Sequence, residues 1–352
     1  MNNRILFFVG VICLLSFFSS CDSSNPEPDD ETTTDTIPTD SSLFNHGVFV
    51  INEGNFNDAD GSLTFIGEDG ALQNNLFNSI NNETLGDVVQ SAHAASDKLY
   101  IVVNNSNKVE VVSLDSLSSL RTITGLGMPR YMASQDGYGY LTEWVSFTSS
   151  GQVKKIDLST DEVIDSIATG SGAEYALVAK DKLYVSNNWS NTISVIDLNT
   201  FQKIKDVEVG DGANYMLVDA GGDVWVGVAG AYQSNDGKLV EIDHQADTVK
   251  RAFELNMNFN GKIAINPAGD LIYFTQSNSL YSADLALGEV EKDYTLTEAI
   301  SVYGIGVSPS GNIYVSDAGT FIENGMVFKF SDTYDLLDSY KVGRIPGAFT
   351  FN

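Results

Sequence analysis

Few side chains in this sequence are suited to catalysis. The three histidines, His46, His93 and His244, are far apart in the chain, and no serine or cysteine nucleophile has a recognisable base. Glu53 and Glu143 could act as the carboxylate pair of a glycoside hydrolase, although the sequence does not give their separation. We therefore predict a protein that is not an enzyme, and a hydrolase is the last-ranked alternative.

Motifs for metals and cofactors are incomplete. Residues 57–61 (N-D-A-D-G) have part of the spacing of a calcium loop but lack its downstream glutamate, which favours a plain β-turn. Two Gly-x-Gly turns, at 170–172 and 210–212, resemble the start of a dinucleotide fingerprint, but no third glycine or helix follows either of them. The sequence predicts neither a metal nor a cofactor.

Aromatic and amide side chains favour ligand binding instead. Aromatic rings supply contact area, and neutral amides both donate and accept hydrogen bonds, so the mixture suits an uncharged ligand rich in amides or hydroxyls. Corrinoids and carbohydrates both have this chemistry. The candidate ligand-binding residues are Phe56, Asn105, Arg130, Tyr131, Trp144, Tyr175, Asn188, Trp189, Tyr215, Tyr232, Gln233 and Tyr303.

A repeat must position these residues. An aromatic residue flanked by aliphatic residues recurs about every 40 to 50 residues, and further strand-like segments and glycine-containing turns follow it. No segment has a convincing helical period. The repeated aromatic residues, which we expect to be core, are Phe49, Tyr100, Tyr140, Tyr184, Trp225, Tyr273 and Tyr314.

The repeat predicts an all-β fold, a seven-bladed β-propeller of four-stranded blades over residues 45–352. The first repeat has no innermost strand before it, whereas residues 347–352 have that pattern and nothing after them. The C-terminal strand should therefore complete the first blade, closing the ring and removing its free edges.

Strand direction assigns the loops to faces. Loops that follow the aromatic strands and loops that lead into the innermost strands should open on the same face, and these segments contain the candidate residues. We therefore expect the candidates to converge there. The alternative is that the aromatic residues only pack long loops onto the ring.

Charge limits the partners of this 352-residue chain. It has 47 acidic and 19 basic residues and a net charge of −28, which argues against nucleic acid and against a polybasic membrane patch. The acidity is spread over the whole chain, which indicates solubility and not a site.

The N-terminus has the pattern of a bacterial lipoprotein. Residues 1–20 form a signal peptide in which Arg4 precedes a short apolar run, and small residues then abut Cys21, as in a lipobox. We predict that Cys21 is lipidated and anchors the chain to a membrane, and that residues 21–44 form an acidic, disordered tether. The alternatives are an ordinary signal peptide with an incidental cysteine and a tether that faces the periplasm.

Several motifs resemble a known family. They are F-V-I-N-E-G-N-F at 49–56, L-G-D-V-V-Q-S at 85–91, Y-I-V-V-N-N-S at 100–106 and P-R-Y at 129–131. They are similar to motifs of the YncE-like seven-bladed propeller lipoproteins of Bacteroidota-type bacteria. Within that group, the BtuG-type proteins capture cobalamin for a TonB-dependent transporter.

The resemblance implies a location, a ligand and a partner. It implies a lipid-anchored protein of the outer membrane that faces the cell exterior. Such a protein would bind cobalamin or a related corrinoid and hand it to a TonB-dependent outer-membrane transporter. A surface glycan-binding lipoprotein is the alternative.

Overall fold

The computed structural model describes Phe44 and residues 46–352. The predicted signal peptide, the lipidated Cys21 and the tether up to residue 43 lie outside the described residues. Phe44, assigned to the end of the tether, is buried, and its ring packs edge-on against that of Phe65 with centroids 5.2 Å apart. Phe44 is therefore part of the core of the first blade.

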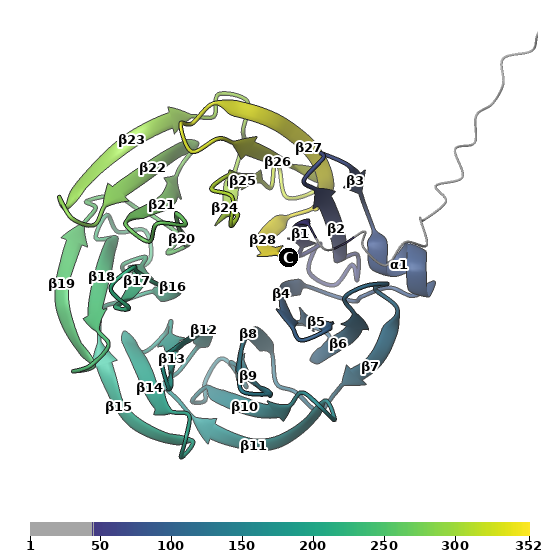
Figure 1. Ribbon diagram of the computed structural model, residues 1–352, viewed down its shortest axis with the longest axis horizontal. Helices are drawn as coiled ribbons and strands as arrows, with labels where there is room; N and C mark the ends of the chain where they lie inside the picture. The colour runs from purple at the N-terminus through teal and green to yellow at the C-terminus, as the bar shows by residue number, and fades with distance from the viewer. Residues whose placement is uncertain (1–43, 45) are drawn as a thin grey trace, which may run out of the picture. The chain divides into compact units, whose positions relative to one another are not determined.

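Seven four-stranded antiparallel sheets are arranged in a ring (Figure 1). The blades, from the innermost strand outward, are β28 (Pro346–Phe351), β1 (Gly47–Asn52), β2 (Ser62–Gly67) and β3 (Leu72–Gln73); β4 (Val89–Ala95), β5 (Lys98–Val103), β6 (Lys108–Ser113) and β7 (Ser119–Ile123); β8 (Pro129–Gln135), β9 (Tyr138–Glu143), β10 (Gln152–Asp157) and β11 (Glu162–Ala168); β12 (Ala173–Ala179), β13 (Lys182–Asn187), β14 (Thr192–Asp197) and β15 (Gln202–Glu208); β16 (Ala213–Val218), β17 (Val224–Val228), β18 (Lys238–Asp243) and β19 (Thr248–Glu254); β20 (Ile263–Ile265), β21 (Leu271–Gln276), β22 (Ser279–Asp284) and β23 (Glu289–Thr295); and β24 (Val302–Val307), β25 (Ile313–Asp317), β26 (Asn324–Phe330) and β27 (Leu336–Arg344). The predicted fold class is confirmed.

The C-terminal strand closes the ring as predicted. β28 pairs antiparallel with β1, in a register that runs from Val48 opposite Phe351 to Asn52 opposite Pro346. The ring of Phe351 also packs against Tyr314 of the seventh blade, with centroids 5.5 Å apart. The last strand therefore joins the first blade to the last one.

The repeated aromatic residues lie in the core. Each occupies the second strand of its blade, and none of the seven is more than 4% exposed. Because both faces of a second strand are covered by neighbouring blades, these strands are buried almost throughout. The prediction that these aromatic residues are structural is confirmed.

One short helix forms although no segment of the sequence has a convincing helical period. α1 (Leu76–Asn81) follows the two-residue strand β3, and it buries Leu76 and Phe77 between the first two blades. Six residues make fewer than two helical turns, too few to give a recognisable period in sequence.

The two faces of the ring differ in their connections. The loop face, as we define it, holds the loops after the second strands, at residues 53–61, 104–107, 144–151, 188–191, 229–237, 277–278 and 318–323. The hairpin face holds the turns between first and second strands, such as residues 96–97 and 136–137, together with Asn352. The predicted assignment of loops to faces agrees with this topology.

A β-bulge interrupts most of the innermost strands near their start on the loop face. The register shifts between Pro129 and Met132 in β8 and between Ala173 and Ala176 in β12, and β4, β16 and β24 have similar shifts. A bulge releases side chains from the regular alternation of a strand. Tyr131 and Tyr175 are released in this way and line the channel.

Within residues 46–352, no helix is long and apolar enough to span a membrane.

Candidate functional site

A ring of polar side chains surrounds the channel at the loop face. Five of these side chains belong to the second residue of an innermost strand. A sixth belongs to the residue just before the innermost strand β20. We call this ring the neck; its members are Gln90, Arg130, Glu174, Asn214, Lys262 and Tyr303, and Glu53 joins it from the loop after β1.

Arg130 and Glu174 form the central ion pair of the neck. Arg130 Nε and Nη2 donate to Glu174 Oε2 and Oε1 over 2.9 Å and 2.6 Å. Trp144 Nε1 donates to the same Oε2 over 2.9 Å, and the Arg130 guanidinium lies 3.9 Å from the centroid of the Trp144 ring. Burial opposes the charge of Arg130, but Glu174 holds the arginine pKa above its usual value. Arg130 is therefore charged, and its two hydrogen bonds to Glu174 fix the orientation of the pair.

Glu53 and Lys262 form the other half of the neck. Burial raises the pKa of Glu53 and lowers that of Lys262, while each charge partly offsets the shift of the other. Tyr303 Oη donates to Glu53 over 3.1 Å, and Lys262 Nζ donates to the carbonyl of Gly347 over 2.9 Å. Because Gln90, Glu174 and Lys262 are at most 9% exposed, the neck is a plug of packed side chains.

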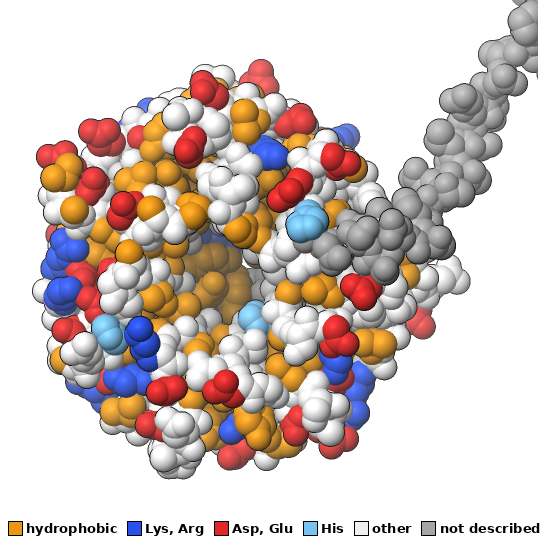
Figure 2. Space-filling model, viewed as in Figure 1, with side chains coloured by type: hydrophobic (Ala, Val, Ile, Leu, Met, Phe, Trp, Pro, Cys, Tyr) orange, Lys and Arg blue, Asp and Glu red, His pale blue; other side chains and the backbone are white. Residues whose placement is uncertain are grey.

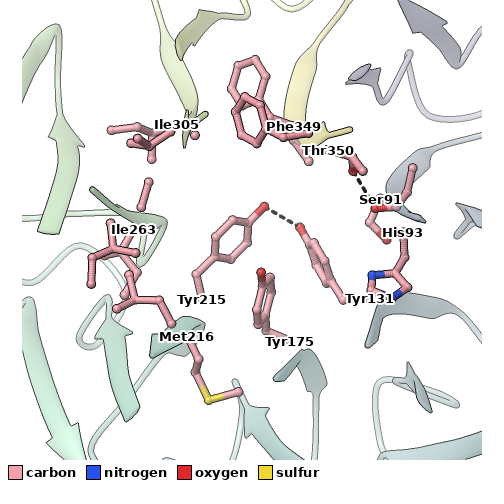
Figure 3. Close-up of a pocket in the computed structure, with 18 of the residues that line it drawn as sticks. Ser91, His93, Tyr131, Tyr175, Tyr215, Met216, Ile263, Ile305, Phe349 and Thr350 are labelled. Carbon is pink, nitrogen blue, oxygen red and sulfur yellow. Dashed lines mark hydrogen bonds between the residues drawn. The ribbon is translucent and has the colours of Figure 1, made fainter. Parts of the chain in front are cut away.

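Three tyrosines form a layer below the neck. The ring centroids of Tyr131, Tyr175 and Tyr215 lie 4.6 to 5.4 Å apart, and the hydroxyls of Tyr131 and Tyr215 are hydrogen-bonded at 2.9 Å (Figure 3). Gln90 Nε2 donates to the Tyr131 hydroxyl over 3.0 Å, which ties this tyrosine layer to the neck.

Beyond the tyrosine layer, the channel contains a cavity of about 350 Å³. Figure 2 shows a hollow at the centre of the ring with largely hydrophobic walls. The residues that line the cavity, none of them charged at neutral pH, are Ser91, Ala92, His93, Tyr131, Met132, Tyr175, Tyr215, Met216, Leu217, Ile263, Ala264, Ile265, Ile305, Gly306, Val307, Ala348, Phe349, Thr350 and Phe351.

A second hollow opens on the loop face between the fourth, fifth and sixth blades. It measures about 680 Å³, and we call it the aromatic–amide cleft. Six of its side chains are neutral amides and three are aromatic, against one carboxylate. The lining residues are Asn188, Trp189, Asn191, Asp211, Gly212, Asn214, Ala229, Gly230, Ala231, Tyr232, Gln233, Asn258, Phe259 and Asn260.

Exposed aromatic rings extend the cleft toward the third blade. Trp189 is 38% exposed and Phe147 70% exposed, and the two rings are stacked with centroids 5.7 Å apart. The rings of Trp144 and Trp189 also pack together, with centroids 4.7 Å apart.

Asn214 contributes a buried Oδ1 that has no hydrogen-bond partner in the part of the chain that the structure describes. Unpaired buried carbonyls are costly and favour a donor from a ligand or water.

The structure divides the sequence-based candidates among four places. The cleft is lined by Asn188, Trp189, Tyr232 and Gln233. The neck includes Arg130 and Tyr303, and Trp144 is hydrogen-bonded to it. The channel is lined by Tyr131, Tyr175 and Tyr215. Phe56 and Asn105 lie on the first two blades, where Asn105 Nδ2 donates to Asp87 and Phe56 is exposed. The candidates share the loop-face half of the ring but do not form one site.

Several residues of these sites are not among the candidates that the sequence predicts. Asn214, Asn258 and Asn260 complete the cleft, and Ile263, Ile305 and Phe349 form walls of the channel cavity. A signal for the neck was present, because the second position of successive innermost strands is polar where a buried strand should be apolar. The channel residues give no such signal, because their pattern in the sequence is the same as that of ordinary core residues.

The two candidate hydrolytic carboxylates have separate environments. Glu143 is fully buried, accepts hydrogen bonds from the Gly127 amide and from Gln152, and burial raises its pKa. Glu53 is bound to Tyr303 in the neck. Glu143 therefore ties together the strands around it, and its buried side chain is not accessible to a substrate.

Three carboxylates come close enough to hold a metal ion. Asp219, Asp223 and Glu241 each place an oxygen within 4.8 Å of the others. Lys250 Nζ already lies 2.7 Å from Asp223 and 2.8 Å from Glu241, and Arg251 also pairs with Glu241. Lys250 and Arg251 therefore offset two of the three negative charges of the cluster from within the protein. In the predicted turn at residues 57–61, Asp58 and Asp60 both pair with Arg344.

These features define a seven-bladed β-propeller with a plugged channel and an aromatic–amide cleft on its loop face. The chain belongs to the family described as a domain of unknown function, DUF5074, whose model matches residues 46–332. No curated protein sequence matches it.

Solved structures share the fold. One is a Quinonprotein alcohol dehydrogenase-like protein from Bacteroides thetaiotaomicron, with a TM-score of 0.68 and 13% identity over 88% of this chain and 78% of that chain. Another is a functionally unknown protein from Desulfotomaculum acetoxidans, with a TM-score of 0.66 and 10% identity over 87% and 98%. Hydrazine synthase of Kuenenia stuttgartiensis gives 0.59 and 15% over 71% and 85%. At these identities the likeness shows the fold alone.

Proposed function

We propose that this protein is a lipid-anchored, cell-surface binder that captures cobalamin or a related corrinoid in the aromatic–amide cleft and passes it to a TonB-dependent outer-membrane transporter. The observation that carries the proposal is the composition of the cleft. Six amide side chains and the rings of Trp189 and Tyr232 converge there with only one carboxylate, Asp211.

The chemistry of a corrinoid matches this surface. Such a ligand has a broad ring edged with amides, so aromatic residues can cover its apolar area while Asn188, Gln233 and Asn258 exchange hydrogen bonds with its edge. The cleft lies on loops held at both ends by β-strands, which limits the ordering cost of binding. The resemblance of the chain's motifs to those of the YncE-like lipoproteins, a group that includes the BtuG-type proteins, supports this choice of ligand.

The stacked rings of Phe147 and Trp189 favour a glycan as the second candidate. Their planes are 27° apart, both rings are exposed, and Trp189 lies among the amides of the cleft. Sugar rings bind to such surfaces through their apolar faces and exchange hydrogen bonds with amides through their hydroxyls.

Calorimetric titration of the purified propeller with cobalamin, and then with a panel of oligosaccharides, tests the proposal. We expect saturable cobalamin binding that quenches tryptophan emission. Trp189→Ala and Gln233→Ala should each weaken it, the tryptophan change by at least tenfold because truncating a hot-spot aromatic costs about 2 kcal/mol or more.

Phe56→Ala is the matched control, because Phe56 is an exposed loop-face aromatic on the first blade, across the ring from the cleft. If cobalamin does not bind, the proposal that the ligand is a corrinoid is wrong. If a glycan binds instead, the protein is a glycan binder. Cobalamin binding that survives Trp189→Ala and Gln233→Ala would place the site elsewhere.

The proposed location has a separate test. Protease added to intact cells should degrade the propeller, and Cys21→Ala should release the protein from the membrane. A propeller that is cleaved only after the outer membrane is opened would leave a periplasmic lipoprotein.

A further inference from the structure

We propose that the central channel is a second binding site, independent of the cleft, for a small neutral aromatic molecule with one hydrogen-bonding group, such as a phenol. The ligand would enter from the hairpin face and rest against the tyrosine layer. The cavity of about 350 Å³ is within the size range of small-molecule sites.

The neck makes the channel a blind pocket. Arg130, Glu174 and Gln90 are hydrogen-bonded across it, and the packed rings of Tyr131, Tyr175 and Tyr215 lie directly below. A ligand in the cavity therefore has no path to the loop face through these buried groups, and the two sites are separate.

The walls of the channel cavity disfavour a charged ligand. Ile263, Ile305 and Phe349 project into the cavity in Figure 3, and none of the lining residues is an Asp, Glu, Lys or Arg. An ionised ligand would lose its hydration here without gaining a partner of opposite charge, and this cost is large. A neutral ring instead gains contact with aliphatic side chains, with the Phe349 ring and with the sulfur of Met216.

Two polar groups can orient the ligand. The Tyr175 hydroxyl has no hydrogen-bond partner among the described residues, in contrast to the paired hydroxyls of Tyr131 and Tyr215 (Figure 3). On the wall, His93 bonds Ser134 Oγ through Nε2 at 2.8 Å, and no hydrogen bond of its other ring nitrogen is found within residues 46–352. Because burial lowers the pKa of His93 to about 4, this imidazole is neutral at pH 7.

Binding of naphthalene and two of its derivatives to the intact propeller tests the proposal. The probes are 2-naphthol, naphthalene and 2-naphthoate, and binding is followed by calorimetry and probe fluorescence. We expect one equivalent of 2-naphthol to bind and the anion 2-naphthoate not to bind. Naphthalene should bind about tenfold more weakly than 2-naphthol because it has no hydroxyl to form the hydrogen bond.

Two variants locate the probe. Tyr175→Phe should reduce 2-naphthol affinity to about that of naphthalene, and Ile305→Trp, which fills the cavity, should abolish binding. If Ile305→Trp does not fold, a crystal structure of the wild-type protein soaked with 2-naphthol gives the position directly. Trp189→Ala is the control, and it should leave naphthol binding unchanged.

The outcomes separate this site from the cleft. No binding of 2-naphthol at millimolar concentration, or a cavity that holds only water in the soaked crystal, would overturn the proposal. Equal affinity for 2-naphthoate or loss of naphthol binding in Trp189→Ala would also overturn it. Failure of cobalamin to bind would leave it standing, because no residue lines both cavities.

Discussion

Arg130 and Glu174 lie 44 residues apart in sequence, yet they meet in the neck as a bidentate ion pair. The pair joins the third blade to the fourth, because Arg130 is the second residue of β8 and Glu174 the second of β12. Trp144, from the loop after β9, completes the assembly through its indole nitrogen. The neck is therefore a link between blades as well as a plug.

The destabilising effects of removing Arg130 and Glu174 should not be additive. Arg130→Met leaves Glu174 buried without its cation and should cost about 3 to 5 kcal/mol, whereas Arg130→Met with Glu174→Leu should cost less than the sum of the single changes. Urea unfolding monitored by circular dichroism measures the differences. Strictly additive effects would mean that the two side chains are not energetically coupled.

Deleting residues 347–352 should lower the melting temperature markedly. The deletion exposes the inner edge of β1 and removes the contact between Phe351 and Tyr314. Differential scanning calorimetry of full-length and truncated propellers provides the comparison. Phe351→Ser is the milder control, since it keeps most of the backbone pairing and should lower the melting temperature less. An unchanged melt on deletion would contradict closure by β28.

His93 should make the propeller sensitive to acid. Burial lowers its pKa to about 4 in the folded protein, against about 6.5 in an unfolded chain. The unfolded state therefore binds the proton more readily, so the contribution of His93 to the free energy of unfolding is complete above pH 6.5 and declines as the pH falls toward 4.

We expect this loss to be about 1 to 3 kcal/mol, with allowance for the partial exposure of the imidazole to the cavity. Urea midpoints between pH 7 and pH 4 should fall less steeply in His93→Gln than in the wild type. Since all acidic groups titrate in both proteins, only the difference reports on His93, and parallel pH profiles would refute the assignment.

Asp161 should be required for the packing of the third blade against the second. Its carboxylate accepts hydrogen bonds from the buried Tyr100 hydroxyl over 2.6 Å and from Lys98 over 2.8 Å. Asp161→Ala leaves both donors without this acceptor and should cost about 2 to 3 kcal/mol. Adding Tyr100→Phe should recover part of the loss, because the buried hydroxyl is then absent. Chemical unfolding of the three variants checks this, and no recovery in the double variant would count against the hydrogen bond.

The sequence alone determined the architecture. The aromatic strand motif, the alternation of buried and exposed residues and the glycine turns are local signals, and each blade repeats them. The missing innermost strand at the start and the extra one at residues 347–352 then determined how the ring closes, since unpaired edges are unfavourable. The same strand directions placed the loops around Trp144, Trp189 and Tyr232 on one face.

The division of the candidate residues among sites could not be predicted from the sequence. Tyr175 and Trp189 are close in sequence, yet one faces the channel and the other the cleft. They differ because the bulge at the start of β12 takes Tyr175 out of the regular alternation of its strand. The polarity of the neck likewise depends on pairs such as Arg130 and Glu174, which neighbouring blades bring together and which no local pattern specifies.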